Sequence, residues 1–140
     1  GLLSTFRELL VYALWIGALC LVGLTFFHFW PTAVPRPAMD LAGYPGFALL
    51  QGVDAAGNAC PSLHVATAAF TALWVEHVLR RVGAPPWLRW CNGLWVGAIV
   101  WSTMATKQHV AWDVAAGLLL AFVFAALSLA GRRGKLQQAV

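Results

Sequence analysis

Charged residues are scarce in this chain. They make up only 10% of its 140 residues, whereas hydrophobic residues make up 61%. A typical soluble domain has about 25% charged and about 45–50% apolar residues. With a mean hydropathy of +0.74, the composition excludes a disordered chain and disfavours an ordinary soluble domain. It indicates a membrane protein, and the length predicts a single domain over residues 1–140.

Cysteine is scarce as well. Cys20, Cys60 and Cys91 are too few and too far apart for a disulfide framework or a thiolate metal site. Cys60 has no evident partner in the sequence, so the sequence assigns it no role. Nine basic and five acidic residues give a net charge of +4. In a chain this apolar the basic residues indicate membrane topology rather than a nucleic-acid partner.

Long uncharged runs dominate the sequence. A transmembrane helix needs about 20 mostly apolar residues, and residues 9–27 and 114–130 contain no charge at all. Residues 63–79 and 90–105 form two weaker runs between them. We therefore predict an all-α, polytopic transmembrane bundle with four spans, at about 9–27, 62–79, 88–105 and 109–130. A soluble helical bundle is the alternative, but a small core does not require uncharged runs this long.

The basic residues predict how the spans are oriented. Four spans place the N-terminus, the 80–89 loop and the C-terminal tail on one side of the membrane. That side carries seven basic residues: Arg7, Arg80, Arg81, Arg89, Arg132, Arg133 and Lys135. The other side carries two, Arg36 and Lys107. Because cytoplasmic segments are enriched in Lys and Arg, we expect a multi-pass cell-membrane protein whose loop 28–61 and turn 103–109 face outward.

His109 and Asp113 stand out among the polar residues on the outer side. They are four residues apart, which on a helix places both on one face. A carboxylate that accepts the Nδ1–H of an imidazole fixes its tautomer and leaves Nε2 as a nucleophile or base. A structural hydrogen bond between two helices is the equally weighted alternative. Gly117 and Ala121 continue this face with small residues, which would let another helix approach closely.

The start of the predicted helix 62–79 carries a second polar group. Ser62 is a natural N-cap, and a helix N-terminus attracts phosphate. His64 in the first turn would face such an anion, although each residue alone is more simply a cap or an ordinary polar side chain. Arg36 and Lys107 are the only cations on the outer side. Together, these residues predict an anion site, with phosphate as the natural ligand.

These residues resemble the type 2 phosphatidic acid phosphatase (lipid phosphate phosphatase) superfamily. Its three signatures are Lys, six residues, Arg-Pro; then Pro-Ser-Gly-His; then Ser-Arg, five residues, His, three residues, Asp. The matching residues are, in order, Arg36-Pro37, Pro61-Ser62-Leu63-His64, and Ser102-Thr103 with His109 and Asp113. The order of the motifs and the predicted topology match as well. Members usually have six spans, so the resemblance implies that these are the last four.

The chain departs from these signatures at two cations. Phe29 stands in place of the first signature's Lys, and Thr103 in place of the third signature's Arg. We expect Lys107 to replace part of this lost charge. The Pro-Ser-Leu-His form and the Lys107-Gln108-His109 run look closer to the branch that contains inositol-phosphoryl transferases.

The resemblance also implies a mechanism. His109 would attack phosphorus, Asp113 would orient its imidazole, and His64 would protonate the leaving lipid oxygen. The expected phosphate-binding side chains are Arg36, Ser62 and Lys107. Water would resolve the phosphohistidine in a phosphatase, and an alcohol would resolve it in a transferase. Neither a metal nor another cofactor is expected, and the substrate would be a lipid phosphate in the bilayer.

The sequence is also compatible with two further classes of protein. The missing Lys and Arg are compatible with a catalytically silent relative, namely a membrane scaffold or lipid-binding protein. A small transporter or proton relay would instead use His64, His109 and Asp113. No motif identifies the lipid headgroup or the oligomeric state.

Overall fold

A computed structural model of the chain describes residues 6–33, 59–105 and 109–137. Most of these residues lie in the four helices α1 (Phe6–Phe29), α3 (Leu63–Arg81), α4 (Pro86–Ala105) and α5 (Ala111–Gln137). The predicted all-α bundle is confirmed. The helix ends agree with the predicted spans to within three residues, except that α5 continues to Gln137.

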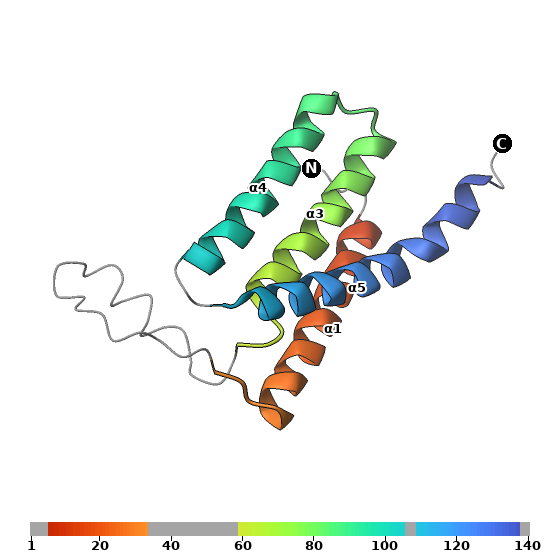
Figure 1. Ribbon diagram of the computed structural model, residues 1–140. Coiled ribbons are helices and arrows are strands. Elements are labelled where there is room, and N and C mark those ends of the chain that lie inside the picture. The colour runs from red at the N-terminus through yellow and green to blue at the C-terminus, as the bar shows by residue number, and fades with distance from the viewer. Residues whose placement is uncertain (1–5, 34–58, 106–108, 138–140) are drawn as a thin grey trace.

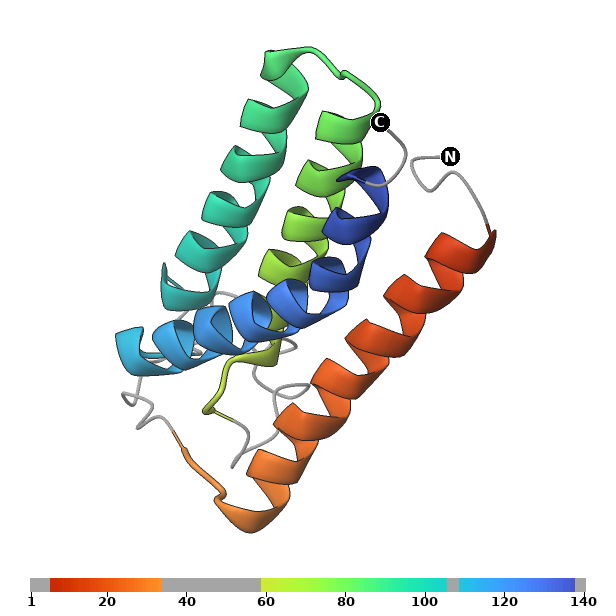
Figure 2. The same ribbon diagram turned by 90° about the vertical axis from the view of Figure 1, so that its right-hand side faces the viewer.

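The central helix of the bundle is α3, which packs against each of the other three helices and most extensively against α5. Figures 1 and 2 show α1 and α4 on opposite sides of α3. In both views the end of α1, the start of α3, the end of α4 and the start of α5 lie at the same end of the bundle. We call this the site end. The turn between α3 and α4 lies at the other end, which we call the turn end.

Local sequence signals determine where α3 begins and ends. Ser62 is its N-cap, with extended backbone and a side chain that accepts the N–H of Val65. Gly83 follows the helix with a φ of +65°, the left-handed conformation that favours glycine after a helix C-terminus. Pro86 then opens α4, where its missing N–H costs nothing because the first helical N–H groups have no partner within the helix.

Aromatic residues of α3 and small residues of α5 form the core. Phe70 and Trp74 are almost completely buried, and the Trp74 indole donates to Ser128 Oγ at 3.1 Å. Ala121 is fully buried against them. A Cβ atom on Gly117 would lie 2.6 Å from the backbone oxygen of Ser62. The small face predicted on this helix therefore does let α3 approach closely.

The faces that point away from the core are also apolar. Leu14 and Leu21 of α1 and Trp90 and Leu94 of α4 are each between 64% and 74% exposed. Such continuous apolar exposure is unusual for a helix surrounded by water. In the described part of the chain, two helices, α1 and residues 111–130 of α5, are long and apolar enough to cross a membrane. These features are consistent with a membrane protein, while the four-span topology stays a prediction.

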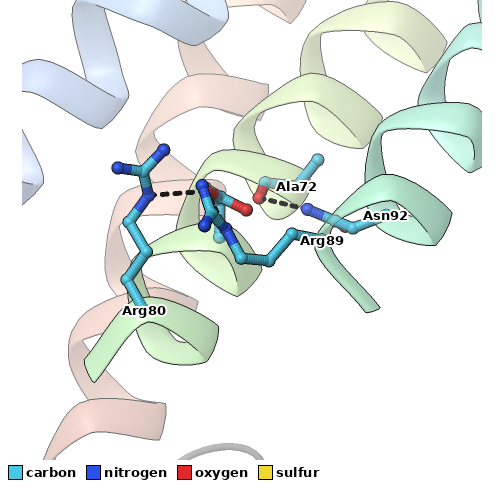
Figure 3. A network of polar contacts seen from close by, with 5 residues as sticks. Ala72, Arg80, Arg89 and Asn92 are labelled. Carbon is cyan, nitrogen blue, oxygen red and sulfur yellow. Dashed lines mark hydrogen bonds and ion pairs between the residues drawn. The ribbon is translucent and has the colours of Figure 1, made fainter. Parts of the chain in front are cut away.

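Ion pairs join the helices near the turn end. Arg81 of α3 forms a two-point ion pair with Glu8 of α1. Glu76 of α3 accepts from Arg80 at 2.6 Å and from Arg89 of α4 at 2.8 Å (Figure 3). Exposed pairs of this kind contribute about 0.2–1 kcal/mol each. They therefore adjust the packing of α1 and α4 on α3, while the apolar core provides most of the stability.

Candidate active site

His109 lies just before α5 and not on it. The predicted helix began at residue 109, but α5 begins at Ala111, so the expectation that one helical turn separates His109 and Asp113 was wrong. The two side chains nevertheless meet, with 3.7 Å between His109 Nδ1 and Asp113 Oδ2. The turn that leads into α5, and not the helix itself, forms this pair.

Asp113 shows why α5 begins where it does. Its Oδ2 accepts the backbone N–H of Val110 at 3.0 Å, while the backbone N–H groups of Asp113 and Val114 both donate to the Val110 oxygen. This is the acidic half of a capping box, and a carboxylate in the first turn is also favoured by the helix dipole. The cap holds the carboxylate so that it points back toward His109.

The imidazole of His109 is buried without hydrogen bonds. Its side chain is only 3% exposed, and neither Nδ1 nor Nε2 has a hydrogen-bond partner among the described residues. The 3.7 Å separation from Asp113 is beyond ordinary hydrogen-bond length. Because buried polar atoms normally have partners, these two nitrogens are a site where the described residues leave hydrogen-bonding capacity unmet.

A second imidazole lies beside the first. His64, in the first turn of α3, is exposed, and its ring centroid is 6.0 Å from that of His109. Ser62 connects the start of α3 to α5, because its backbone N–H donates to the Asp113 oxygen at 3.1 Å. The structure thus brings together four of the predicted site residues: His64, His109, Asp113 and Ser62.

Cys60 is a neighbour of the site that the sequence did not reveal. Burial raises the pKa of its thiol, and the adjacent Asp113 carboxylate raises this pKa further by its charge and by a hydrogen bond. The backbone N–H of Cys60 donates to Thr32 Oγ1 at 2.8 Å, which fastens the segment before α3 to the segment after α1. The only available signal was the position of Cys60 next to the Pro61-Ser62 signature.

Thr103 and Phe29, the two residues that depart from the family signatures, carry no positive charge. Thr103 is buried, and its hydroxyl donates to Val100 O at 2.9 Å within its own helix. Its backbone oxygen accepts the N–H of His109 at 3.4 Å, so Thr103 supports the site through the main chain. Phe29 is 65% exposed at the end of α1, with its ring against that of His28.

The two predicted cations, Arg36 and Lys107, lie outside the described residues. Their roles in phosphate binding therefore stay predictions. Within the described ranges no group of three or more His, Cys, Asp or Glu side chains is arranged to hold a metal ion.

The fold and this site define an all-α bundle with membrane-type faces and a histidine–aspartate pair where its helices converge. The model of the PAP2 superfamily matches residues 2–127, which include the histidines, the aspartate and the N-cap serine. The chain therefore belongs to the PAP2 superfamily, and the resemblance stated from its motifs is confirmed at that level. Comparisons with curated proteins and with solved structures gave no match. Membership supports a phosphatase or phosphotransferase enzyme that acts on lipid phosphates in a membrane.

Proposed function

We propose that this protein is an integral-membrane, metal-independent phosphoric ester hydrolase that acts on lipid phosphates through a phosphohistidine. The observation that carries the proposal is the buried His109 ring. Its nitrogens have no hydrogen-bond partner in the described chain, while Asp113 lies on one side and the His64 ring centroid is 6.0 Å away. Superfamily membership supports the same class of reaction.

In the first step, His109 Nε2 attacks phosphorus in line with the ester oxygen. The N–P bond forms, and the bond from phosphorus to the lipid oxygen breaks. Protonated His64 gives its proton to this oxygen, so the lipid leaves as an alcohol. The imidazole of His109 becomes positively charged, and the Asp113 carboxylate facing Nδ1 stabilises that charge.

In the second step, water attacks phosphorus and the N–P bond breaks. His64, now neutral, takes a proton from the water, inorganic phosphate leaves, and His109 recovers its lone pair. An alcohol that enters in place of water would receive the phosphoryl group instead. The same site then performs transfer, so the acceptor determines which of the two reactions is observed.

Phosphate binding is assigned to the start of α3 and to two cations. The first turn of α3 begins at Ser62, beside His64, and a helix N-terminus favours an anion. We propose that Arg36 and Lys107 provide the positive charge that Phe29 and Thr103 lack. Donors preorganised around developing charge are the usual means of stabilising such a transition state.

The proposed site faces the extracytoplasmic side. The described arginines Arg80, Arg81 and Arg89 lie at or near the turn end, whereas His64 and His109 lie at the site end. Because basic residues are enriched on the cytoplasmic side, we propose that the turn end lies inside. The phosphate would then sit at headgroup level while the lipid tail stays in the bilayer.

The experiment measures phosphate release from a panel of lipid phosphates in EDTA, for the full chain and for His109→Ala. We expect release that survives EDTA and disappears in the variant. If the chain releases no phosphate, the panel is repeated with a phospholipid donor and free inositol as acceptor. Transfer in that assay would replace hydrolysis as the function, and inactivity in both assays would support a silent relative.

A further inference from the structure

A groove of about 340 Å³ runs between α3 and α4 and begins at His64. Its base lies along α3, at Thr67, Ala68 and Ala72, and one wall is the Trp95 side of α4. From His64 to Ala72 the groove follows α3 for about 12 Å, at 1.5 Å per residue. It therefore runs along α3 from the candidate active site toward the turn end.

Most of the lining surface of this groove is apolar. Ala68 and Ala72 contribute only methyl groups, and Trp95 contributes a large aromatic surface that is otherwise 70% exposed. Thr67, Thr71 and Asn92 also line the groove. Their side chains donate to the Leu63, Thr67 and Ala72 oxygens at 2.7, 2.7 and 2.9 Å, so these hydrogen bonds stay within the bundle. Among the described lining residues, His64 at the mouth is the only ionisable side chain.

At its far end the groove lies beside a hydrogen bond between the two helices. Asn92 Nδ2 of α4 donates to the Ala72 oxygen of α3 at 2.9 Å (Figure 3). A second groove, of about 590 Å³, opens beyond this bond next to Glu76 and Arg89. That one lies toward the turn end and does not reach the histidines. Of these two grooves, the first is the one that reaches His64 of the candidate active site.

We propose that the groove between α3 and α4 binds the hydrocarbon tail of the lipid phosphate whose headgroup lies between His64 and His109. The inference rests on the proposed function and names the part of the protein that selects the tail. An apolar channel with one ionisable group at its mouth matches an amphiphile with one charged end. Its length of about 12 Å along α3 limits how many methylene groups it can cover, so the chain length of the substrate affects how well it binds.

The test narrows the groove by Ala68→Leu and compares phosphatidic acids with short and long acyl chains in the same detergent micelles. The matched control is Ala98→Leu, the same change at an exposed position of α4 outside the groove. We expect Ala68→Leu to lower kcat/KM for the long chain about tenfold more than for the short chain, because tail methylenes lose their burial. The control should leave both values unchanged. Equal losses for both chains, or a similar loss in the control, would overturn the groove as the tail site.

A binding measurement separates failure of this inference from failure of the proposed function. A long-chain phosphatidic acid with a photoreactive group in its acyl chain is cross-linked to the full chain, and the labelled peptides are mapped. We expect label on residues 64–72 and 92–99, and less label there in Ala68→Leu. This pattern would support the groove even if no phosphate were released. Label spread over the exposed faces of α1 and α5 would refute it even in an active enzyme.

Discussion

The two ends of the bundle differ in how their charged side chains are paired. Toward the turn end, Glu8 and Glu76 are each paired with arginine. At the site end, the ion-pair partner of Asp113 in the described chain is a histidine 3.7 Å away. The two imidazole nitrogens of His109 have no hydrogen-bond partner among the described residues. Paired charges connect helices, whereas unsatisfied groups beside a helix terminus are available for chemistry.

The two ends of the bundle also differ in how closely their helices must pack. Exposed side chains form the ion pairs, and these can adjust to small displacements of the helices. At the site end the backbones of Ser62 and Gly117 lie against each other, and Ser62 N–H donates to the Asp113 oxygen. A small shift between α3 and α5 would therefore separate the groups that are proposed to react, and geometry matters more for function there.

Among changes that leave His109 in place, the largest effect is expected from Asp113→Asn. The amide oxygen can still accept the Val110 N–H, so the cap of α5 remains, but the negative charge facing His109 is lost. We expect kcat to fall by a factor on the order of 10⁴, as for a triad histidine that loses its carboxylate partner, with little change in helix content by circular dichroism. A kcat within threefold of the parent value would show that the Asp113 charge does not assist His109.

Gly117→Ala tests the close contact between the helices. Its Cβ would lie 2.6 Å from the Ser62 oxygen, so α3 or α5 must move. We expect a loss of about 1–3 kcal/mol in the free energy of unfolding, as for other overpacked sites, together with reduced kcat. Gly97→Ala is the control, because a Cβ there meets nothing within 4 Å and the helix gains up to about 1 kcal/mol. Equal melting temperatures for the two variants would contradict the account.

Alkylation of Cys60 tests the charge of Asp113 independently of activity. Burial and the Asp113 carboxylate raise the pKa of this thiol, so it stays protonated to higher pH and reacts slowly near neutrality, because the thiolate is the nucleophile. Removing the charge by Asp113→Asn lowers the pKa. We expect the pH profile of iodoacetamide labelling, followed by mass spectrometry of the Cys60 peptide, to move toward lower pH. An unchanged profile would mean that the two groups do not interact.

The smallest effect is expected from Glu76→Gln near the turn end. The change removes the shared acceptor of Arg80 and Arg89, but both guanidinium groups retain access to solvent. We expect the free energy of unfolding, measured by thermal unfolding, to fall by less than about 1 kcal/mol, and kcat to stay unchanged. A large loss of activity would show that the two ends of the bundle are coupled. It would contradict the separation between ion pairs at the turn end and reactive groups at the site end.

Much of the fold follows from local patterns. Uncharged runs predicted the four helices, and motif spacing predicted the pairing of His109 with Asp113. The start of α5 was misplaced because spacing alone cannot show that Asp113 caps the helix from its third position and leaves His109 before it. The proximity of Cys60 to Asp113 was not predictable, because it depends on how the segment before α3 packs beside α5. The groove below His64 likewise exists only once α3 and α4 have packed.

The central claim is that His109 becomes phosphorylated. The most direct test mixes the full chain with a lipid phosphate labelled with ³²P, quenches the reaction in base within one turnover, and maps the labelled peptide. The account predicts an acid-labile label on the peptide that contains His109, which is absent from His109→Ala. Rapid turnover with no such label, or with label on another residue, would contradict it.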